Sequence, residues 1–492
     1  MNPFMAIPLS ESIEFALNAI SGILAEAILV LGIVIGLIIA VLPGKSRLTL
    51  PWVTAAILLS CLAAVWNQTT AGSQTGWLVS DEMSRWFQAV SIVVSLLLLY
   101  PFSQDLRIHS ESDQRKGELY VLILSTLLGV FLLLRANQFI LAYIGIELIS
   151  ISSYILVSYT RRETRTAEAG VKFFLYGATA SGFFLYGVSW LYGLGGGLEF
   201  LNPSYTIALA SSGAWVFPAC LILIGLLFKL GSFPMHAWMP DAWEGSTYPV
   251  NTFLSILPKT AALIFLIRWT VVVSNLPSFE TYRWILVLLS IVSMTWGNLA
   301  ALRQIHMRRL LAYSGVAHAG FLLMAVAIAT PQGFRAAMFY LTIYAVMNLA
   351  IFLMADGFHR GMGHARWQEW EGRGRLFPWA TASLAIILAS LTGLPPSGGF
   401  IAKWLLFISA LEFPSPLMIT LVIAGTLNTV LALAYYMIIP SRMVFRPTPQ
   451  GDQAARQFPA YEWGMGMILG IILLISGIWG FDRMLGLFSS WF

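Results

Sequence analysis

Three lysines lie inside long apolar segments: Lys229 in LILIGLLFKLG, Lys259 in FLSILPKTAALIFL and Lys403 in SGGFIAKWLLF. Burial disfavours the charged form of a lysine, so such a group can gain and lose a proton near neutral pH. An arginine could not, because it stays charged. Arginines far outnumber lysines in this chain, yet the interior positions hold lysine. The presence of lysine rather than arginine at these positions indicates proton transfer rather than a fixed positive charge.

A structural alternative exists for each lysine, because a lysine near a helix end commonly extends its ammonium group to the membrane interface. Lys259 is too deep in its apolar segment for this. Lys403 follows an interruption and could lie closer to an interface.

Glu147 is the acidic counterpart, in the segment FILAYIGIELISISSYILVSY. Tyr143, Ser150 and Tyr154 stand at i−4, i+3 and i+7 from it and therefore share its helix face. A polar stripe on an apolar helix should face the interior, where the acid can pair with a buried lysine and change its pKa. The alternative is a structural hydrogen bond between helices.

Five further titratable residues have less distinctive surroundings. His236 follows Lys229 but lies beyond a proline, and His318 lies in another apolar segment. Neutral histidines are good proton relays, although each is equally well explained as a satisfied interior residue. Glu26 is read as an interfacial acid, and Asp241 and Glu244 either gather protons at a cytoplasmic mouth or are simply solvated.

These residues must be positioned by membrane-spanning helices. The chain has 492 residues, of which 58% are hydrophobic and only 10% charged, far from the roughly 25% charged residues of soluble proteins. Apolar runs of about 20 residues predict an all-α polytopic membrane protein with fourteen spans. We place them near 20–42, 51–66, 84–101, 119–134, 137–158, 170–192, 214–239, 248–269, 283–302, 309–329, 334–356, 377–411, 416–440 and 463–481.

The seventh and twelfth spans are long, interrupted by Gly and Pro, and carry a lysine. They are five spans apart, which predicts two five-helix repeats of opposite orientation, and interrupted helices at matching positions indicate an ion site. We therefore divide the chain into an N-terminal three-helix segment (1–118), repeats at 119–270 and 271–441, and a C-terminal loop and span (442–492). The repeat is one of topology, because the lysine precedes the break in one case and follows it in the other.

The positions of the basic residues and of the cysteines narrow the class of membrane protein further. Basic residues concentrate in the loops after odd-numbered spans, which places those loops in the cytoplasm and both termini on the other side. The positive net charge therefore does not indicate nucleic-acid binding. The only cysteines, Cys61 and Cys220, lie in apolar segments. They offer no ligand cluster for zinc or iron–sulfur, and no dinucleotide-binding glycine motif occurs.

Four motifs carry a resemblance to a known family: ELISISSYILVSY, LIGLLFKLGSFPMHAWMPDAWEGSTYPV, MRRLLAYSGVAHAG and LTGLPPSGGFIAKW. In this order they resemble the antiporter-like subunits of respiratory complex I, above all subunit N (subunit 2) of proton-translocating NADH:quinone oxidoreductase. The resemblance implies fourteen helices with inverted repeats and a proton path through Glu147, Lys229, Lys259 and Lys403. It also implies quinone, FMN and iron–sulfur clusters in partner subunits, and neighbouring antiporter-like subunits as partners. The sequence departs at Ser246–Pro249, where the family usually has an Ala-Pro-Thr-Pro-like turn.

The resulting hypothesis is a subunit of a NADH, NADPH or ferredoxin:quinone oxidoreductase, an enzyme complex in which this chain translocates protons and binds no cofactor or metal. The alternatives are a subunit of a multi-subunit Na+/H+ antiporter and a subunit of an energy-converting membrane hydrogenase. A bacterial plasma membrane is the expected location, with thylakoid and mitochondrial inner membranes also open.

Overall fold

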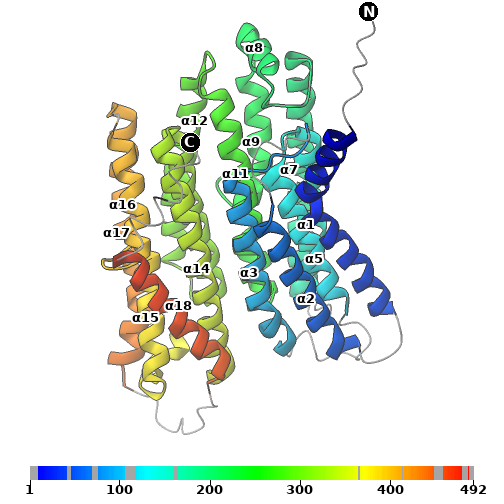
Figure 1. Ribbon diagram of the computed structural model, residues 1–492. Helices are drawn as coiled ribbons and strands as arrows, with labels where there is room; N and C mark the ends of the chain where they lie inside the picture. The colour runs from blue at the N-terminus through cyan, green and yellow to red at the C-terminus, as the bar shows by residue number, and fades with distance from the viewer. Residues whose placement is uncertain are drawn as a thin grey trace, which may run out of the picture. The chain divides into compact units, whose positions relative to one another are not determined.

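The computed structural model is built from α-helices joined by mostly short connections (Figure 1). It describes residues 9–41, 46–68, 76–105, 117–159, 164–363, 366–412, 414–447, 458–478 and 486. These residues form 17 α-helices, two 3-10 helices and no strand beyond isolated bridges. The predicted all-helical fold is therefore confirmed.

The helices follow the apolar segments of the sequence. They are α1 (Leu9–Val41), α2 (Ser46–Trp66), α3 (Glu82–Gln104), α5 (Gly117–Arg135), α6 (Phe139–Val157), α7 (Thr164–Gly195), α8 (Pro203–Ser212), α9 (Val216–Leu230), α10 (Trp238–Gly245), α11 (Tyr248–Val273), α12 (Phe279–Ala301), α13 (Met307–Ile328), α14 (Pro331–Met362), η2 (Trp367–Trp370), η3 (Arg373–Leu376), α15 (Pro378–Thr392), α16 (Gly398–Leu411), α17 (Pro416–Phe445) and α18 (Ala460–Ile478). Among the described residues, 12 helices are long and apolar enough to cross a membrane. The pairs α9–α10 and α15–α16 account for the two interrupted spans that the sequence predicts.

Local backbone chemistry explains both interruptions. Gly231 ends α9 with a φ of 65°, in the left-handed region that favours glycine. Gly393 ends α15 with a φ of 89°, and the Ser397 side chain then accepts the Phe400 N–H to cap α16. Each interruption also contains a cis X–Pro bond, at Phe233–Pro234 and Pro395–Pro396.

The chain divides into two compact units. Unit 1 comprises Met1–Ser153 and Leu198–Asn202, and unit 2 comprises Tyr154–Gly197 with Pro203–Ser490. In unit 1, α5 and α6 meet at two glycines. A Cβ on Gly129 would lie 2.8 Å from the Gly145 carbonyl oxygen, and a Cβ on Gly145 would lie 2.9 Å from that of Gly129. Only small residues permit this approach, which fixes the face of α6 two residues before Glu147.

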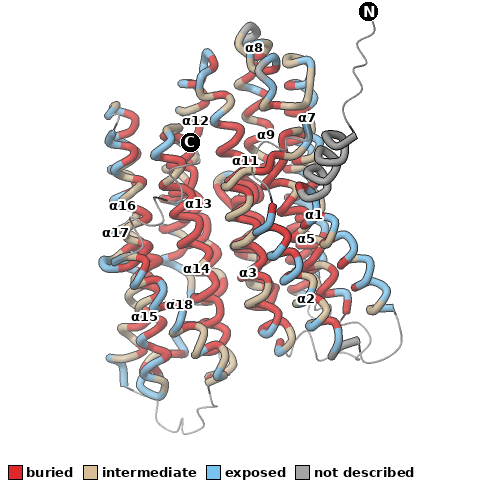
Figure 2. The backbone as a smooth tube through the Cα atoms, in the orientation of Figure 1, coloured by how far each residue is buried: buried red, intermediate tan, exposed pale blue. Residues whose placement is uncertain are grey.

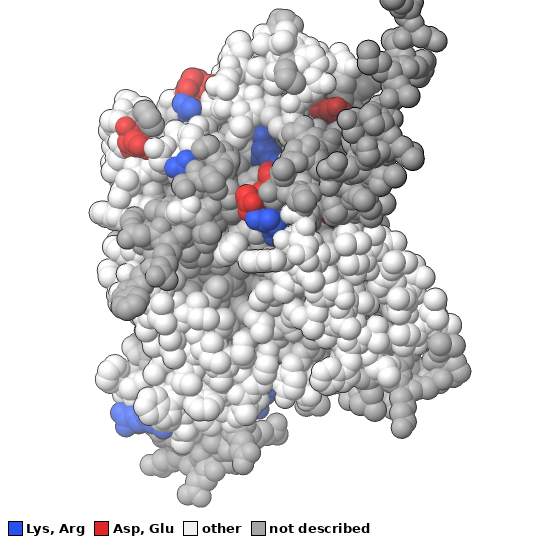
Figure 3. All heavy atoms as spheres, viewed as in Figure 1, with Lys and Arg blue, Asp and Glu red and all other residues white. Residues whose placement is uncertain are grey.

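In unit 2, the helices α11, α13 and α14 are buried over almost their whole length (Figure 2). Helix α12 packs closely on α13, because a Cβ on Gly297 would lie 2.6 Å from the Ala317 nitrogen. Ser290 Oγ also donates a hydrogen bond to the Gly320 carbonyl across this contact. The face of the molecule in Figure 3 shows few charged side chains among uncharged ones. Most residues of α11, α13 and α14 are therefore enclosed by the other helices of unit 2.

Some expectations need revision or lie outside the described residues. Helix α8 lies between the predicted spans 170–192 and 214–239, where the apolar pattern predicts no helix. The basic segments 42–45, 106–116, 160–163 and 448–457, which support the predicted orientation, lie outside the described residues, as does the end of the last predicted span. The inverted relation between the two five-helix groups stays a prediction.

Candidate proton-relay site

Lys229 lies in the last turn of α9, directly before the break. It is buried, with 4% of its surface exposed, and its Nζ lies 5.2 Å from the centroid of the Phe228 ring. A Cβ on Gly231 would lie 2.5 Å from Met239 Sδ. The break therefore folds α10 closely against the end of the helix that carries Lys229.

Lys259 lies near the middle of α11 and is 1% exposed. Its Nζ donates a 2.7 Å hydrogen bond to the carbonyl oxygen of Gly315 on α13. It also lies 5.5 Å from the ring centroid of Tyr344 on α14, within cation–π range. The predicted deep burial of this lysine is correct, and a carbonyl dipole and an aromatic face offset part of the desolvation.

His318 lies on α13 beside the same tyrosine. Its Nδ1 is 2.7 Å from the Tyr340 hydroxyl, and its ring centroid is 5.3 Å from that of Tyr344. The hydroxyl of Tyr344 is buried without a hydrogen-bond partner among the described residues.

Lys403 is buried more deeply than an interfacial lysine would be, at 3% exposure. Its Nζ donates hydrogen bonds to the carbonyl oxygens of Thr392 at 2.7 Å and Leu391 at 3.4 Å, and it lies 4.6 Å from the Phe321 ring centroid. The side chain reaches back from α16 to the free carbonyls at the end of α15. Those carbonyls carry the negative end of the helix dipole and stabilise a cation.

Helices α11, α13 and α14 therefore place Lys259 and His318 beside Tyr344, with Tyr340 on the other side of the imidazole. Lys403 on α16 lies against Phe321, whose ring is 6.3 Å from that of Tyr340. Sequence reasoning singled out the two lysines and the histidine but missed the tyrosines. Their i, i+4 spacing on an apolar helix, the same signal that identified Glu147, could have found them. The arrangement can hold and move protons, because amine, imidazole and phenol groups all exchange them.

Glu147 lies on α6, in unit 1. Its side chain is half-buried, and its Oε1 is buried without a hydrogen-bond partner among the described residues. Ser150 of the predicted stripe bonds within its own helix, to the Ile146 carbonyl at 2.6 Å. A buried carboxylate oxygen without a donor is costly, and such groups concentrate at functional sites.

His236 does not join the lysines. It lies in the turn between α9 and α10, with its ring 5.8 Å from the ring of Phe233 and 6.1 Å from that of Trp296 on α12. Among the described residues, no hydrogen bond links it to a lysine, and its Nδ1 is buried without a partner. The break turns the His236 ring toward Trp296 on α12 rather than toward α14.

Asp241 and Glu244 on α10 are neither bare proton collectors nor freely solvated. Arg309 Nη1 on α13 lies 2.8 Å from a carboxylate oxygen of each, and Lys172 on α7 lies 3.0 Å from Asp241. Burial raises the pKa of Asp241, but hydrogen bonds from Lys172 and Arg309 outweigh this and hold its pKa below its usual value. The network fastens α10 to α7 and α13.

Glu26, read from the sequence as an interfacial acid, is buried. Arg135 Nη1 lies 2.6 Å from its Oε1, and Gln88 Nε2 donates to the same oxygen at 3.2 Å. Arg135 also donates to the Val79 carbonyl and the Ser80 hydroxyl. Arg135, the last residue of α5, is 1% exposed. The pair ties α1, α3 and α5 together.

A second buried acidic group was missed by sequence reasoning. Asp356 on α14 lies 2.5 Å from Arg360, and Glu462 on α18, 1% exposed, lies 3.4 Å from the same arginine. A Cβ on Gly357 would lie 3.1 Å from Glu462 Cβ, so the glycine permits this close approach of α18. The sequence signal that could have found Glu462 is its position as an acidic residue at the start of the apolar segment of α18.

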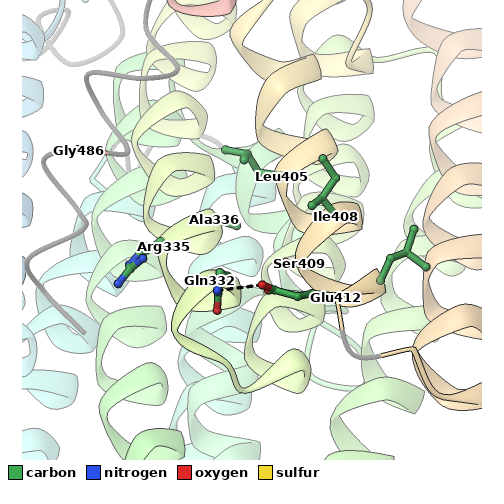
Figure 4. A pocket seen from close by; sticks show the side chains of 9 residues that line it. Gln332, Arg335, Ala336, Leu405, Ile408, Ser409, Glu412 and Gly486 are labelled. Atoms are coloured by element: carbon green, nitrogen blue, oxygen red, sulfur yellow. Dashed lines mark hydrogen bonds between the residues drawn. The ribbon is translucent and has the colours of Figure 1, made fainter.

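A cavity of about 650 Å³ opens between the start of α14 and the end of α16 (Figure 4). Gln332, Arg335, Leu405, Ile408 and Glu412 line it, and Gln332 donates to Glu412 at 3.0 Å. None of the lysines or histidines discussed above lines this cavity. Within the described residues, no group of three His, Cys, Asp or Glu side chains could hold a metal ion.

Comparison with known proteins identifies the architecture. The family model described as "NADH:quinone oxidoreductase/Mrp antiporter, TM" matches residues 136–431, more than half of the chain. A NAD(P)H-quinone oxidoreductase subunit 2 from Picosynechococcus sp. is 33% identical over 477 residues, covering 93% of this chain and 89% of the relative. A NADH-quinone oxidoreductase subunit N 2 from Chloroherpeton thalassium is 34% identical, covering 82% and 80%.

Solved structures agree with these sequence relatives. A chain of respiratory complex I from Thermus thermophilus superposes with a TM-score of 0.76 at 28% identity, covering 94% of this chain and 98% of that chain. A chain of the Mrp complex from Dietzia sp. gives a TM-score of 0.81 at 20% identity, covering 96% of both, which shows a shared fold. The chain is thus a member of the NADH:quinone oxidoreductase/Mrp antiporter transmembrane family, with subunit N and subunit 2 of NAD(P)H-quinone oxidoreductases among its relatives.

Proposed function

We propose that this chain is the N-type (subunit 2) membrane subunit of a NAD(P)H:quinone oxidoreductase and translocates protons through Glu147, Lys229, Lys259 and Lys403. One observation carries the proposal. Lys259, His318 and Lys403 are all buried, with Lys259 and His318 on either side of Tyr344 and Lys403 against Phe321, which neighbours Tyr340. A row of groups that each accept and release a proton, enclosed from water and lipid, supports relayed transfer.

In this role the lysines cycle between charged and neutral forms. Carbonyls and aromatic faces around Lys259 and Lys403 stabilise the ammonium form without neutralising it permanently, as a carboxylate would. His318 transfers protons between them, and Glu147 acts as the acidic member of the path. His236, turned toward α12, is left as a side residue rather than a member of the row.

The driving reaction is assigned to other subunits. We infer that quinone, FMN and iron–sulfur clusters are held by partner chains, with NADH, NADPH or ferredoxin as the electron donor. Neighbouring antiporter-like membrane subunits would couple this chain to them. The name of the cyanobacterial relative favours a quinone-linked complex. We further propose a bacterial plasma membrane, with both termini on the non-cytoplasmic side.

A Na+/H+ antiporter subunit is the second candidate, because the Mrp chain has the same fold. Its 20% identity is well below the 33% and 34% of the quinone oxidoreductase relatives, which favours the first assignment. No specific observation favours a membrane hydrogenase.

Purification of the tagged chain from its native membrane tests the assignment. We expect it to co-purify with a complex that reduces quinone, and vesicles containing that complex to take up protons during turnover. Lys259→Ala should abolish proton uptake by the assembled complex. Sodium-dependent proton exchange without a redox substrate would instead establish the antiporter function.

A further inference from the structure

Both ring nitrogens of His318 face tyrosine hydroxyls, and the two tyrosines come from different helices. Nδ1 lies 2.7 Å from Tyr340 on α14, and Nε2 lies 3.5 Å from Tyr436 on α17. All three side chains are buried. An imidazole that can take a proton at one nitrogen and release one at the other needs a partner on each side.

The Tyr436 hydroxyl has a second partner on α13. It forms a hydrogen bond with Ser314 Oγ, one helical turn before His318. The next residue, Gly315, provides the carbonyl that binds Lys259 Nζ at 2.7 Å. Among the described residues, no direct hydrogen bond joins Lys259 to His318. Tyr436 therefore lies between the turn that holds Lys259 and the imidazole of His318.

We infer that Tyr436 is a relay residue that, with Ser314, carries protons between the Lys259 end of the row and His318. The inference rests on the proposed function. In the forward direction, the Tyr436 O–H bond breaks as an N–H bond forms at Nε2, and the phenol oxygen takes the proton of Ser314 Oγ, which is replaced by one released as an N–H bond of the Lys259 ammonium breaks. At the same time the Nδ1–H bond breaks as Tyr340 takes that proton, and the Tyr340 hydroxyl proton passes to the neutral Lys403 amine, where an N–H bond forms. Only O–H and N–H bonds are exchanged, and no electron moves.

The two contacts of His318 differ in hydrogen-bond strength. The 2.7 Å contact at Nδ1 is a strong hydrogen bond, whereas 3.5 Å at Nε2 is at the outer limit of one. Transfer at Nε2 therefore needs a closer approach of the Tyr436 hydroxyl than this structure shows.

The adjacent Tyr435 provides a matched control. It is equally buried, but its hydroxyl donates to Asn298 Oδ1 at 3.0 Å, and Asn298 Nδ2 donates to Asn428 Oδ1 at 2.9 Å. These bonds link α17 to α12, and none of the relay residues belongs to them. The Tyr435 ring packs 4.4 Å from that of Tyr436, so the two tyrosines share their packing and differ in the partners of their hydroxyls. Replacing either by Phe keeps that ring contact and removes only the hydroxyl.

The test compares Tyr436→Phe with Tyr435→Phe in the complete complex in vesicles, with proton uptake normalised to assembled complex. Tyr436→Phe should lower uptake by tenfold or more, on the order of a lost proton-transfer group. Tyr435→Phe should reduce assembly but leave normalised uptake unchanged. Equal normalised uptake in both variants would overturn the inference.

A second measurement applies even if Tyr436→Phe fails to assemble. A fluorinated tyrosine at position 436 keeps the ring and hydroxyl but makes the phenol more acidic. The pH profile of uptake should move toward lower pH, and an unmoved profile would overturn the relay role. Lys259→Ala distinguishes a failure of this inference from a failure of the proposed function. If it abolishes uptake while Tyr436 variants are normal, only this inference fails, whereas normal uptake in Lys259→Ala removes the proposed function itself.

Discussion

The ammonium nitrogen of Lys403 lies 2.7 Å from the carbonyl oxygen of Thr392, the last residue of α15. The lysine follows the break in the sequence, but its charge returns to the end of the preceding half-helix. Lys229, which precedes its break, lies in the last turn of α9. Both interrupted helices thus place a lysine at a helix C-terminus, the end whose dipole favours a cation.

Gly393→Ala is expected to impair proton uptake through Lys403. Gly393 has a φ of 89°, and a Cβ there would lie 2.9 Å from Lys403 Cδ, so alanine would be strained and would push the lysine aside. Gly363→Ala is the matched control, because Gly363 ends α14 with a φ of 76° but has nothing within 4 Å. Both should lose about 1–3 kcal/mol of stability from backbone strain, but only Gly393→Ala should lose uptake per assembled complex. Equal uptake in the two variants would contradict the role of this carbonyl–lysine contact.

Lys229→Arg is expected to stop proton uptake while the complex still assembles. Arginine keeps the positive charge that the surroundings of position 229 accommodate, but it cannot release a proton. Lys172→Arg serves as the control, because Lys172 is half-exposed and forms ion pairs with Glu168 and Asp241 that arginine can also form. Uptake by vesicles with the assembled variants decides the question. Normal uptake in Lys229→Arg would make Lys229 a fixed electrostatic support.

Arg135→Leu is expected to destabilise unit 1 strongly, by about 3–5 kcal/mol, because it leaves the buried carboxylate of Glu26 without its charge partner. Arg283→Leu should cost at most about 1 kcal/mol, because its partner Glu280 is largely exposed. The yield and thermal stability of the purified complex measure both effects. Adding Glu26→Gln to Arg135→Leu should recover part of the loss, and no recovery would show that Arg135 acts mainly through Val79 and Ser80.

The pH dependence of stability is expected to include a contribution from Asp241. Its pKa is lower in the folded chain than in the unfolded one, so its ionised form stabilises the fold above about pH 4, the unfolded value. This contribution is lost as the pH falls through the folded pKa. Asp241→Asn should cost about 1 kcal/mol or less near neutral pH, since the network is partly exposed. Thermal unfolding between pH 3 and 7 should show a smaller acid-side decline in the variant than in the parent, and identical declines would rule the contribution out.

The helices and their interruptions could be predicted from the sequence because they depend on local chemistry. Gly231 and Gly393 end helices through their own backbone freedom, and apolar run length marks the spans. The burial of Lys259 followed in the same way from its distance to either helix end.

The contacts of the candidate site could not be predicted because they join residues far apart in the chain. Tyr436 and His318 are separated by 118 positions, and nothing in the sequence around Tyr435 and Tyr436 shows which of the two hydroxyls faces His318. Arg135 resembled a loop arginine, since only packing against Glu26 on α1 reveals its burial. The direction of Lys403 was missed because its long side chain turns back at the break.

The burial of α11, α13 and α14 has an electrical consequence. Lys259 and His318 lie near the middle of helices that are long and apolar enough to cross a membrane, so we expect both near mid-depth. Under the proposed function, a proton that passes between two groups at the same depth moves perpendicular to the transmembrane field, so the voltage does almost no work on it. The full cost of about 2.3 kcal/mol per charge per 100 mV falls on the steps that connect the row to either surface. Membrane voltage should therefore slow proton entry and exit while leaving transfer between the buried residues nearly unaffected.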